Sequence, residues 1–215
     1  MPLVYQQNIN ATSKLGVWHI TEPEQFFLQK VSLKREITHP HKRLQHLAGR
    51  IMLTELYPDF PFELVRIADT KKPFLENEAF HFSISHCGNY AAVIVSRDYR
   101  VGVDVELTSL KVDKVKHKFL SLQEQVVIVE ASPAFATGLP IQLLTAAWSI
   151  KESLYKWYGD GEINFKKHLV IEKLTVSGNE GVAHCKFLKD SDIKLTVHFL
   201  FFNDHCISWV LSNVS

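Results

Sequence analysis

The chain has little of what marks secreted, membrane-spanning or nucleic-acid-binding proteins. Its 215 residues include three cysteines, an odd number that is easier to explain as reduced thiols than as a disulfide framework. No basic segment followed by a long apolar stretch opens the sequence, and no apolar run approaches membrane-spanning length. Lys and Arg total 24 against 23 Asp and Glu, so general attraction to nucleic acid or to an anionic membrane is not expected. We therefore expect a cytoplasmic protein that binds neither nucleic acid nor membrane, in which any anion binding is local.

Apolar residues make up 46% of the chain, which is enough to bury a real core, and the order of the expected elements repeats. In the first half, apolar residues spaced by three and four between Leu44 and Met52 predict a helix. Three strand-like runs follow and predict a meander: 79–85, 90–96 and 101–106. In the second half, a long helix over 140–158 precedes alternating runs that predict antiparallel strands from 169 to 211. Capping boxes are expected at 21–24 and 121–124.

This repetition predicts an α+β fold, a pseudo-dimer of two similar lobes in which helices pack on a small, mainly antiparallel sheet. We place the lobes at residues 1–107 and 108–215 and expect a monomer with an internal pseudo-two-fold. A functional site is expected at the seam between the lobes.

The first chemically informative segment is Gly102-Val103-Asp104-Val105-Glu106. Because successive side chains of a strand alternate between its faces, Asp104 and Glu106 share one face. Two like charges on one face repel unless something positive lies between them. The alternative is the solvated face of an edge strand.

The second segment is Trp148-Ser149-Ile150-Lys151-Glu152-Ser153-Leu154-Tyr155-Lys156. A helix here places Glu152 and Lys156 one turn apart, which is also the spacing of an ordinary surface ion pair. If the strand and the helix meet, three carboxylates converge beside an ammonium. That combination suits a hard divalent cation and a phosphate.

Two further patterns leave alternatives open. Arg43 and Arg50 lie on the polar face of the first-half helix, which is either solvated or a phosphate clamp, since guanidinium groups match phosphate oxygens. Each cysteine follows a histidine, as in His86-Cys87, but no C-x-x-C pair supports a zinc site.

Taken together, these segments resemble the 4′-phosphopantetheinyl transferases, specifically the larger pseudo-dimeric type that activates surfactin and siderophore synthetases. The resemblance covers about residues 42 to 156, while the last quarter matches only in being rich in strands. The matching residues, which also agree in order and spacing, are Lys72-Pro73, Phe82-Ser83-Ile84-Ser85-His86, Gly102-Val103-Asp104-Val105-Glu106, Trp148-Ser149-Ile150-Lys151-Glu152 and Lys156.

The resemblance implies transfer of phosphopantetheine from coenzyme A to a serine of an apo acyl or peptidyl carrier protein, leaving adenosine 3′,5′-bisphosphate. By the same resemblance, Asp104, Glu106 and Glu152 would bind Mg²⁺ with the pyrophosphate of coenzyme A. Glu152 would also be a candidate base for the carrier serine, and Lys156 would stabilise the pyrophosphate or the leaving group. The contacts implied for coenzyme A are Lys72, Pro73, Ser85, His86 and Lys156, with Arg43 and Arg50 near its 3′-phosphate.

The sequence departs from the family pattern at two of these places. Cys87 stands where many relatives have serine, and Lys71 precedes Lys72-Pro73 where glycine is common. Fatty acid, polyketide and nonribosomal peptide carriers all stay open as acceptors. The alternatives are a metal-dependent nucleotide phosphohydrolase, which uses the same carboxylates with water as nucleophile, and a non-catalytic module that binds coenzyme A or docks a carrier.

Overall fold

The computed structural model describes residues 3–31, 33, 36–132 and 140–214, and the chain forms two compact units. Unit 1 comprises Met1–Val101 and Asn213–Ser215, and unit 2 comprises Gly102–Ser212. Each contains helices packed on a sheet whose recorded strand pairs are antiparallel, so the α+β class predicted from the sequence is confirmed.

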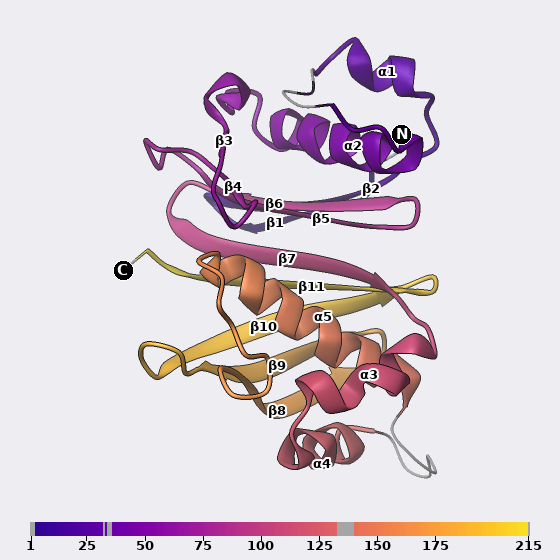
Figure 1. Cartoon of the computed structure of the whole chain (residues 1–215), viewed down its shortest axis with the longest axis vertical. Coiled ribbons are helices and arrows are strands. Elements are labelled where there is room, and N and C mark those ends of the chain that lie inside the picture. Colours follow the sequence, from indigo (N-terminus) through magenta and orange to yellow (C-terminus); the bar gives the residue numbers. More distant parts are fainter. Residues whose placement is uncertain (1–2, 32, 34–35, 133–139, 215) are drawn as a thin grey trace. The chain divides into compact units, whose positions relative to one another are not determined.

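Unit 1 is built on a four-stranded sheet in the order β1-β2-β6-β5, with the long helix α2 packed on it (Figure 1). The core beneath α2 includes Leu47, Ile51 and Met52, which are members of the predicted apolar stripe. The elements of this part of the chain are β1 (Leu3–Asn10), β2 (Ser13–His19), α1 (Glu24–Leu28), α2 (Pro40–Leu56), the 3-10 helix η1 (Phe62–Leu64), β3 (Arg66–Ile67), β4 (Pro73–Phe74), β5 (His81–Cys87) and β6 (Tyr90–Ser96).

Two expectations for this half differ from the structure. Strands β5 and β6 pair as predicted, but β7 (Tyr99–Leu107) does not continue the meander, because the other edge of β6 is already paired with β2. The capping box at 21–24 is also absent: Pro23 is the N-cap of α1 and the Glu24 carboxylate pairs with Arg43 instead.

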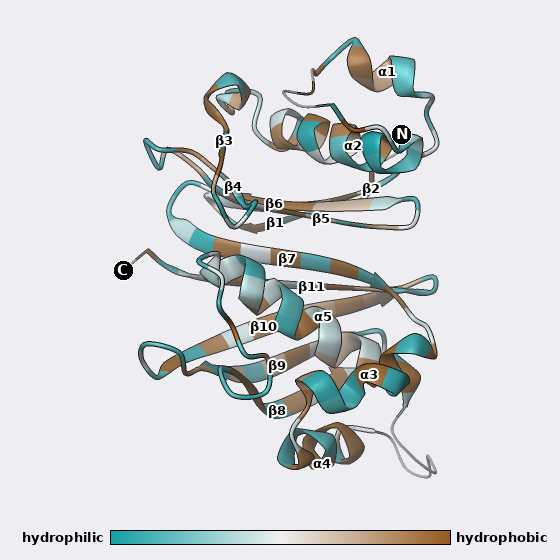
Figure 2. Ribbon diagram, in the orientation of Figure 1, coloured by the Kyte–Doolittle hydropathy of each residue, from teal (hydrophilic) through white to brown (hydrophobic). Residues whose placement is uncertain are grey.

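Unit 2 contains a five-stranded sheet in the order β7-β11-β10-β9-β8, with α5 lying across it (Figure 1). Figure 2 shows hydrophobic and hydrophilic bands along β7, in line with a sequence in which valines alternate with charged residues, although residues 101–105 are all buried. The remaining elements are α3 (Lys111–Phe119), α4 (Leu122–Glu130), α5 (Ile141–Tyr158), β8 (Leu169–Ser177), β9 (Glu180–Phe187), β10 (Ile193–Phe202) and β11 (His205–Asn213).

The helix ends of unit 2 follow the local sequence. Ser121 and Glu124 form the predicted capping box at the start of α4, each side chain accepting from the other's backbone N–H. The long predicted helix is confirmed as α5, which ends at Tyr158. The C-cap, Gly159, has φ of 82°, a left-handed conformation that glycine adopts without strain. Within the described ranges, no helix is long and apolar enough to cross a membrane.

Candidate active site

Asp104 lies in the buried middle of β7, and Glu106 lies just beyond it, where the strand becomes half-buried. Val103 and Val105 are buried, as the alternation predicts, but Asp104 is also only 2% exposed. The solvated edge-strand interpretation therefore does not hold for Asp104. A carboxylate with so little access to water needs a compensating charge or hydrogen bond nearby.

Helix α5 supplies that compensation. Lys156 Nζ lies 2.6 Å from Asp104 Oδ1, and Trp148 Nε1 donates to Glu106 Oε1 at 3.0 Å. Glu152 lies one turn before Lys156 on the same helix, mostly withdrawn from solvent. We call Asp104, Glu106, Glu152 and Lys156 the acidic site.

The acidic site lies within unit 2. The sequence-based boundary after residue 107 assigned the acidic strand to the N-terminal lobe, whereas the structure divides the chain before Gly102. The physical reason is that β7 hydrogen-bonds to β11 and packs against α5, so strand and helix share one unit.

Burial and mutual repulsion disfavour ionisation of two of the carboxyls. Desolvation, then the charge of Asp104, raise the pKa of Glu106 from 4.5 to about 7, against the opposing hydrogen bond from Trp148. Desolvation and Asp104 likewise raise the pKa of Glu152 to about 7, with Lys156 acting in the opposite direction. Near neutral pH the site therefore holds more negative charge than its single lysine offsets, and additional positive charge would be bound favourably.

The donor chemistry fits a hard divalent cation, because carboxylate oxygens are its preferred protein ligands. Among the residues that the structure describes, however, no group of three or more His, Cys, Asp and Glu side chains is arranged to enclose a metal ion. Two protein donors lie on these carboxylates: Lys156 on Asp104 Oδ1 and Trp148 on Glu106 Oε1. Each carboxylate has two oxygens, so a cation could be bound without opening the ion pair between Asp104 and Lys156.

These pKa shifts predict how Glu106→Gln changes stability in the presence of a chelator. Glu106 holds its proton in the folded state up to about pH 7 but loses it near 4.5 when unfolded, so folding becomes less favourable as pH rises between these values. Glutamine keeps the acceptor for Trp148 and removes this cost. The variant should gain about 3 kcal/mol over the unmutated chain at about pH 8 and almost nothing at about pH 4.

Urea unfolding at both pH values measures this difference, with Glu130→Gln on the exposed end of α4 as the control. A gain that is the same at both pH values would show that Glu106 is not responsible.

The close approach of β7 and α5 depends on a glycine. A Cβ added to Gly102 would lie 2.7 Å from Trp157 N and 2.8 Å from Trp157 Cβ, and closer still to Ser153 O. Two of these three atoms are backbone atoms of α5, so the helix itself would have to move. This contact fixes the distance between the strand bearing Asp104 and the helix bearing Lys156.

Gly102→Ala is therefore expected to lower the free energy of unfolding by about 3 kcal/mol, at the upper end of ordinary overpacking. Gly178→Ala is the matched control. Gly178 has φ of 61° and open space around it, so only backbone strain of about 1 kcal/mol is expected there. Thermal or urea unfolding compares them, and equal losses would contradict the packing role of Gly102.

Apart from Lys156 on α5, the residues implied to contact coenzyme A lie in unit 1, on α2, β4, β5 and the segment before β4. Arg43 is engaged within that unit: its Nε and Nη2 donate to the carboxylate of Glu24 at 2.7 and 2.9 Å, and its Nη1 donates to Ile37 O at 2.7 Å. The hydrogen bond from Arg43 lowers the pKa of Glu24. Arg43 thus ties α1 to α2, a role that the sequence did not indicate.

The other implied contacts are spread over the same unit. The rings of His86 and His46 meet at 5.2 Å, and the Arg50 guanidinium lies over the Phe62 ring at 5.6 Å. Ser85 is buried on β5. Lys72 and Pro73 follow Lys71, whose φ of 68° is left-handed, the conformation that favours the glycine common in relatives.

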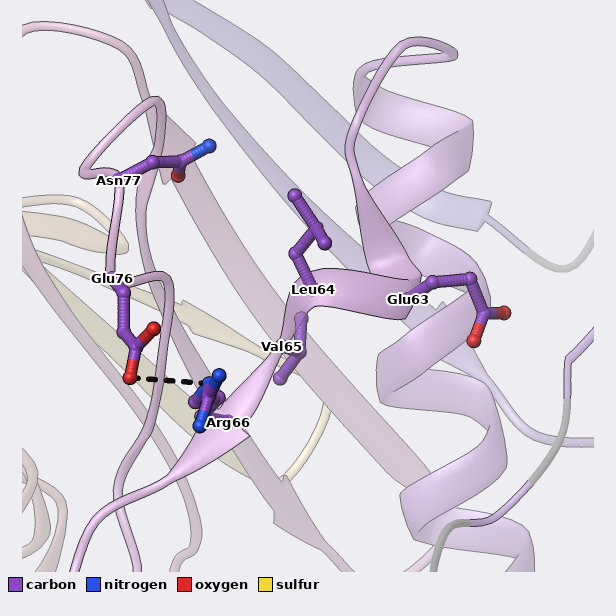
Figure 3. A pocket seen from close by; sticks show the side chains of 6 residues that line it. All are labelled: Glu63, Leu64, Val65, Arg66, Glu76 and Asn77. Atoms are coloured by element: carbon purple, nitrogen blue, oxygen red, sulfur yellow. Dashed lines mark ion pairs between the residues drawn. The ribbon is translucent and has the colours of Figure 1, made fainter.

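A pocket in unit 1 offers no further candidate for a ligand-binding site. Six residues around η1, β3 and the segment after β4 line it: Glu63, Leu64, Val65, Arg66, Glu76 and Asn77 (Figure 3). Arg66 and Glu76 point toward one another and pair at 3.1 Å with well-exposed side chains, so the cation is already offset by an anion.

Sequence reasoning missed the residues that support the acidic site. In the sequence, Trp148 and Lys151 stand out only as parts of the motif shared with the family, and Glu124 only as a capping residue. The one sign of their role is a charged residue in an apolar stretch of α5: Lys151 is fully buried among residues such as Ile150 and Leu154.

Comparison with known proteins places the chain in a family. A family model for the 4′-phosphopantetheinyl transferase superfamily matches residues 100–210, just over half of the chain, and the chain belongs to this superfamily. The matched region contains the whole acidic site.

Three relatives illustrate the similarity. The chain is 34% identical over 122 residues to enterobactin synthase component D of Salmonella austin, covering 55% of the chain and 49% of the relative. It is 30% identical over 118 residues to the protein of that name in Escherichia coli strain K12, with 54% of each covered. It is 29% identical over 121 residues to 4′-phosphopantetheinyl transferase AcpT of Salmonella typhimurium, covering 55% and 60%. The chain spans about half the length of the curated relatives it matches.

Proposed function

We propose that the chain is an enzyme that transfers 4′-phosphopantetheine from coenzyme A to a serine of an apo acyl or peptidyl carrier protein, with Mg²⁺ as cofactor. The acidic site is the observation that supports this proposal most directly: one buried carboxyl, two half-buried ones and a lysine meet inside the region that matches the superfamily. The names of relatives, a phosphopantetheinyl transferase and a synthase component, support the same reaction.

Asp104, Glu106 and Glu152 are the residues proposed to hold the cation. A bound Mg²⁺ would supply positive charge at the pyrophosphate of coenzyme A. The Lys156 ammonium has three N–H donors, one of which it gives to Asp104, and it is the cation proposed to meet a phosphate oxygen. Lys156 is thus proposed to stabilise the charge on the pyrophosphate or on the leaving group.

Glu152 is the proposed general base. In the metal-free chain, burial and Asp104 raise the pKa of Glu152 to about 7. A bound cation would lower this pKa, and the ionised carboxylate would then accept the proton directly or through water. It would take the proton of the carrier serine as the serine oxygen bonds to the phosphorus that carries the pantetheine arm. The bond from that phosphorus to the nucleotide breaks, and adenosine 3′,5′-bisphosphate leaves with the bonding electrons.

The decisive experiment incubates the purified chain with Mg²⁺, coenzyme A and a panel of apo carriers, followed by intact mass of the carrier. A gain of one phosphopantetheine, lost with a chelator, is expected. Hydrolysis of coenzyme A without any carrier would instead support the phosphohydrolase alternative. Binding of coenzyme A with no turnover on any carrier would support the non-catalytic module.

The contacts to coenzyme A are proposed as Lys72, Pro73, Ser85, His86 and Lys156, with Arg43 and Arg50 at the 3′-phosphate. The Glu24 carboxylate is hydrogen-bonded to the Arg43 guanidinium, so a 3′-phosphate would have to compete with Glu24 for the same N–H donors. A cytoplasmic location, a monomeric state and a pseudo-two-fold relation between two lobes stay predictions.

Arg43→Ala is expected to raise the KM for coenzyme A more than it lowers kcat, because the contact is to a part of the substrate that does not react. Glu24→Gln is the matched control: it weakens the same ion pair but leaves the guanidinium in place, so its KM should stay the same or fall. Steady-state kinetics with coenzyme A and dephospho-coenzyme A measure both. Equal KM values for the two donors in the unmutated chain would show that the chain makes no favourable contact with the 3′-phosphate.

A further inference from the structure

A buried ion pair lies beside the acidic site in unit 2. Lys151 Nζ lies 2.6 Å from Glu124 Oε1, and the two side chains are 0% and 1% exposed. The same ammonium donates to Phe119 O at 2.6 Å and to Phe165 O at 2.8 Å. Lys151 therefore has three acceptors for its three N–H donors, which is full satisfaction for an ammonium group.

Glu124 is equally committed. Its Oε2 accepts from Ser121 N at 2.8 Å in the capping box, and its Oε1 also accepts from Ile171 N on β8 at 3.1 Å. The pair thus joins the start of α4 and strand β8 to the middle of α5. A buried ion pair is often no more stabilising than apolar residues of similar volume, so its geometry is the more informative property.

The two carbonyls that Lys151 holds belong to residues whose rings pack on one tryptophan. The Phe119 ring meets Trp148 edge to face at 5.0 Å, and the Phe165 ring stacks on Trp148 at 5.5 Å. Phe119 is the last residue of α3, and Phe165 lies in the connection between α5 and β8, so regular helix or strand bonding does not fix either carbonyl. Lys151 fixes both.

Trp148 in turn holds a member of the acidic site, since its Nε1 donates to Glu106 Oε1 at 3.0 Å. A continuous series of contacts therefore runs from Glu124 and Lys151, through the two phenylalanines, to Trp148 and Glu106. A small displacement of the indole would move or break this hydrogen bond.

We propose that Lys151 and Glu124 are positioning residues for the acidic site: by fixing the backbones of Phe119 and Phe165 they orient Trp148, which holds Glu106 in place. The catalytic meaning of this role rests on the proposed function, but the positioning itself does not. Supporting residues of this kind typically alter metal affinity about 10-fold to 100-fold when replaced.

The test is a thermodynamic cycle on Mn²⁺ affinity, measured by calorimetry on the whole chain. Lys151→Met with Glu124→Gln removes the charges together, keeps similar volumes and leaves glutamine as an acceptor for backbone N–H groups. Trp148→Phe removes the donor to Glu106. The double variant and Trp148→Phe are each expected to weaken Mn²⁺ binding about tenfold. The variant with all three substitutions should bind Mn²⁺ no more weakly than Trp148→Phe alone. An unchanged affinity in the double variant, or fully additive losses, would overturn the proposal.

A second readout does not depend on metal. In the ¹⁵N-labelled, metal-free chain, the indole N–H resonance of Trp148, assigned by its loss in Trp148→Phe, should shift in the double variant. A resonance that stays in place would overturn the positioning role. Should the double variant fail to fold, Phe165→Leu removes one ring from the indole without touching the ion pair, and the same shift and weaker binding are expected.

Ser149→Ala is the control for general loss of stability. Ser149 lies next to Trp148 on α5 and shares a buried hydrogen bond of 2.9 Å with Ser208, but it makes no part of the series described above. It should lower the unfolding midpoint with unchanged Mn²⁺ affinity. Absence of transfer to every carrier tested would overturn the proposed function and leave these binding and resonance measurements to decide the positioning role.

Discussion

An Asp104→Asn chain is expected to transfer phosphopantetheine at least about a hundredfold more slowly than the unmutated chain. Asparagine keeps the shape of the side chain but removes one carboxylate from the proposed metal ligands. It also removes the charge that pairs with Lys156 at 2.6 Å and that raises the pKa of both Glu106 and Glu152. Intact mass of an apo carrier, followed over time with excess coenzyme A and Mg²⁺, gives the rate.

The fold is expected to survive this change, because a repelling charge is removed along with the ion pair and Lys156 retains partial access to water. Asp192→Asn is the same substitution at an exposed position of unit 2 and controls for effects of purification and storage. This variant should transfer phosphopantetheine at the rate of the unmutated chain. Full activity of Asp104→Asn would exclude Asp104 from the metal ligands, and lost activity with a collapsed circular dichroism spectrum would make it structural.

The acidic site could be anticipated from the sequence because its pattern is local on each element. Alternation along β7 places Asp104 and Glu106 at matching positions, and helical spacing places Glu152 one turn from Lys156. The meeting of the two elements was inferred from chemistry, and the ion pair between Asp104 and Lys156 confirms that strand and helix meet. Glycine at 102 is the structural condition for that meeting, but a single glycine in a strand does not reveal which backbone approaches it.

The assignment of β7 to a sheet could not be read from the sequence. Three consecutive strand-like runs favour a meander, but long-range pairing decides the outcome: β2 takes the free edge of β6, and β7 joins β11 about a hundred residues later in the chain. Strand β1 was missed altogether. Half of its residues, Leu3–Asn10, are polar, and half of its side chains are exposed, as on an edge strand.

The support for Trp148 was missed for a similar reason. Lys151 and Glu124 are separated by 27 positions, and no local sequence pattern around either residue predicts that the two form an ion pair. In sequence, a lysine within a helix is normally a solvated residue. Only the tertiary fold shows that this one lies inside the core of unit 2 with three acceptors.

The burial of that pair leads to the largest expected effect on stability. Lys151→Met alone should lower the free energy of unfolding by about 3–5 kcal/mol, because it leaves the Glu124 carboxylate buried without its cation and releases the carbonyls of Phe119 and Phe165. Adding Glu124→Gln should restore much of this loss, since the second substitution removes the uncompensated charge. Urea unfolding of the single and double variants measures the difference between them.

Lys186→Met is the matched control, because Lys186 also pairs with a glutamate at 2.6 Å, but on the surface, where Glu172 is 41% exposed. Water can replace the lost partner there, so the control should show a much smaller loss. A loss of equal size at both positions would mean that burial does not set the cost. If Lys151→Met is strongly destabilised and Glu124→Gln restores nothing, the two carbonyl contacts, and not the ion pair, carry the stability that Lys151 contributes.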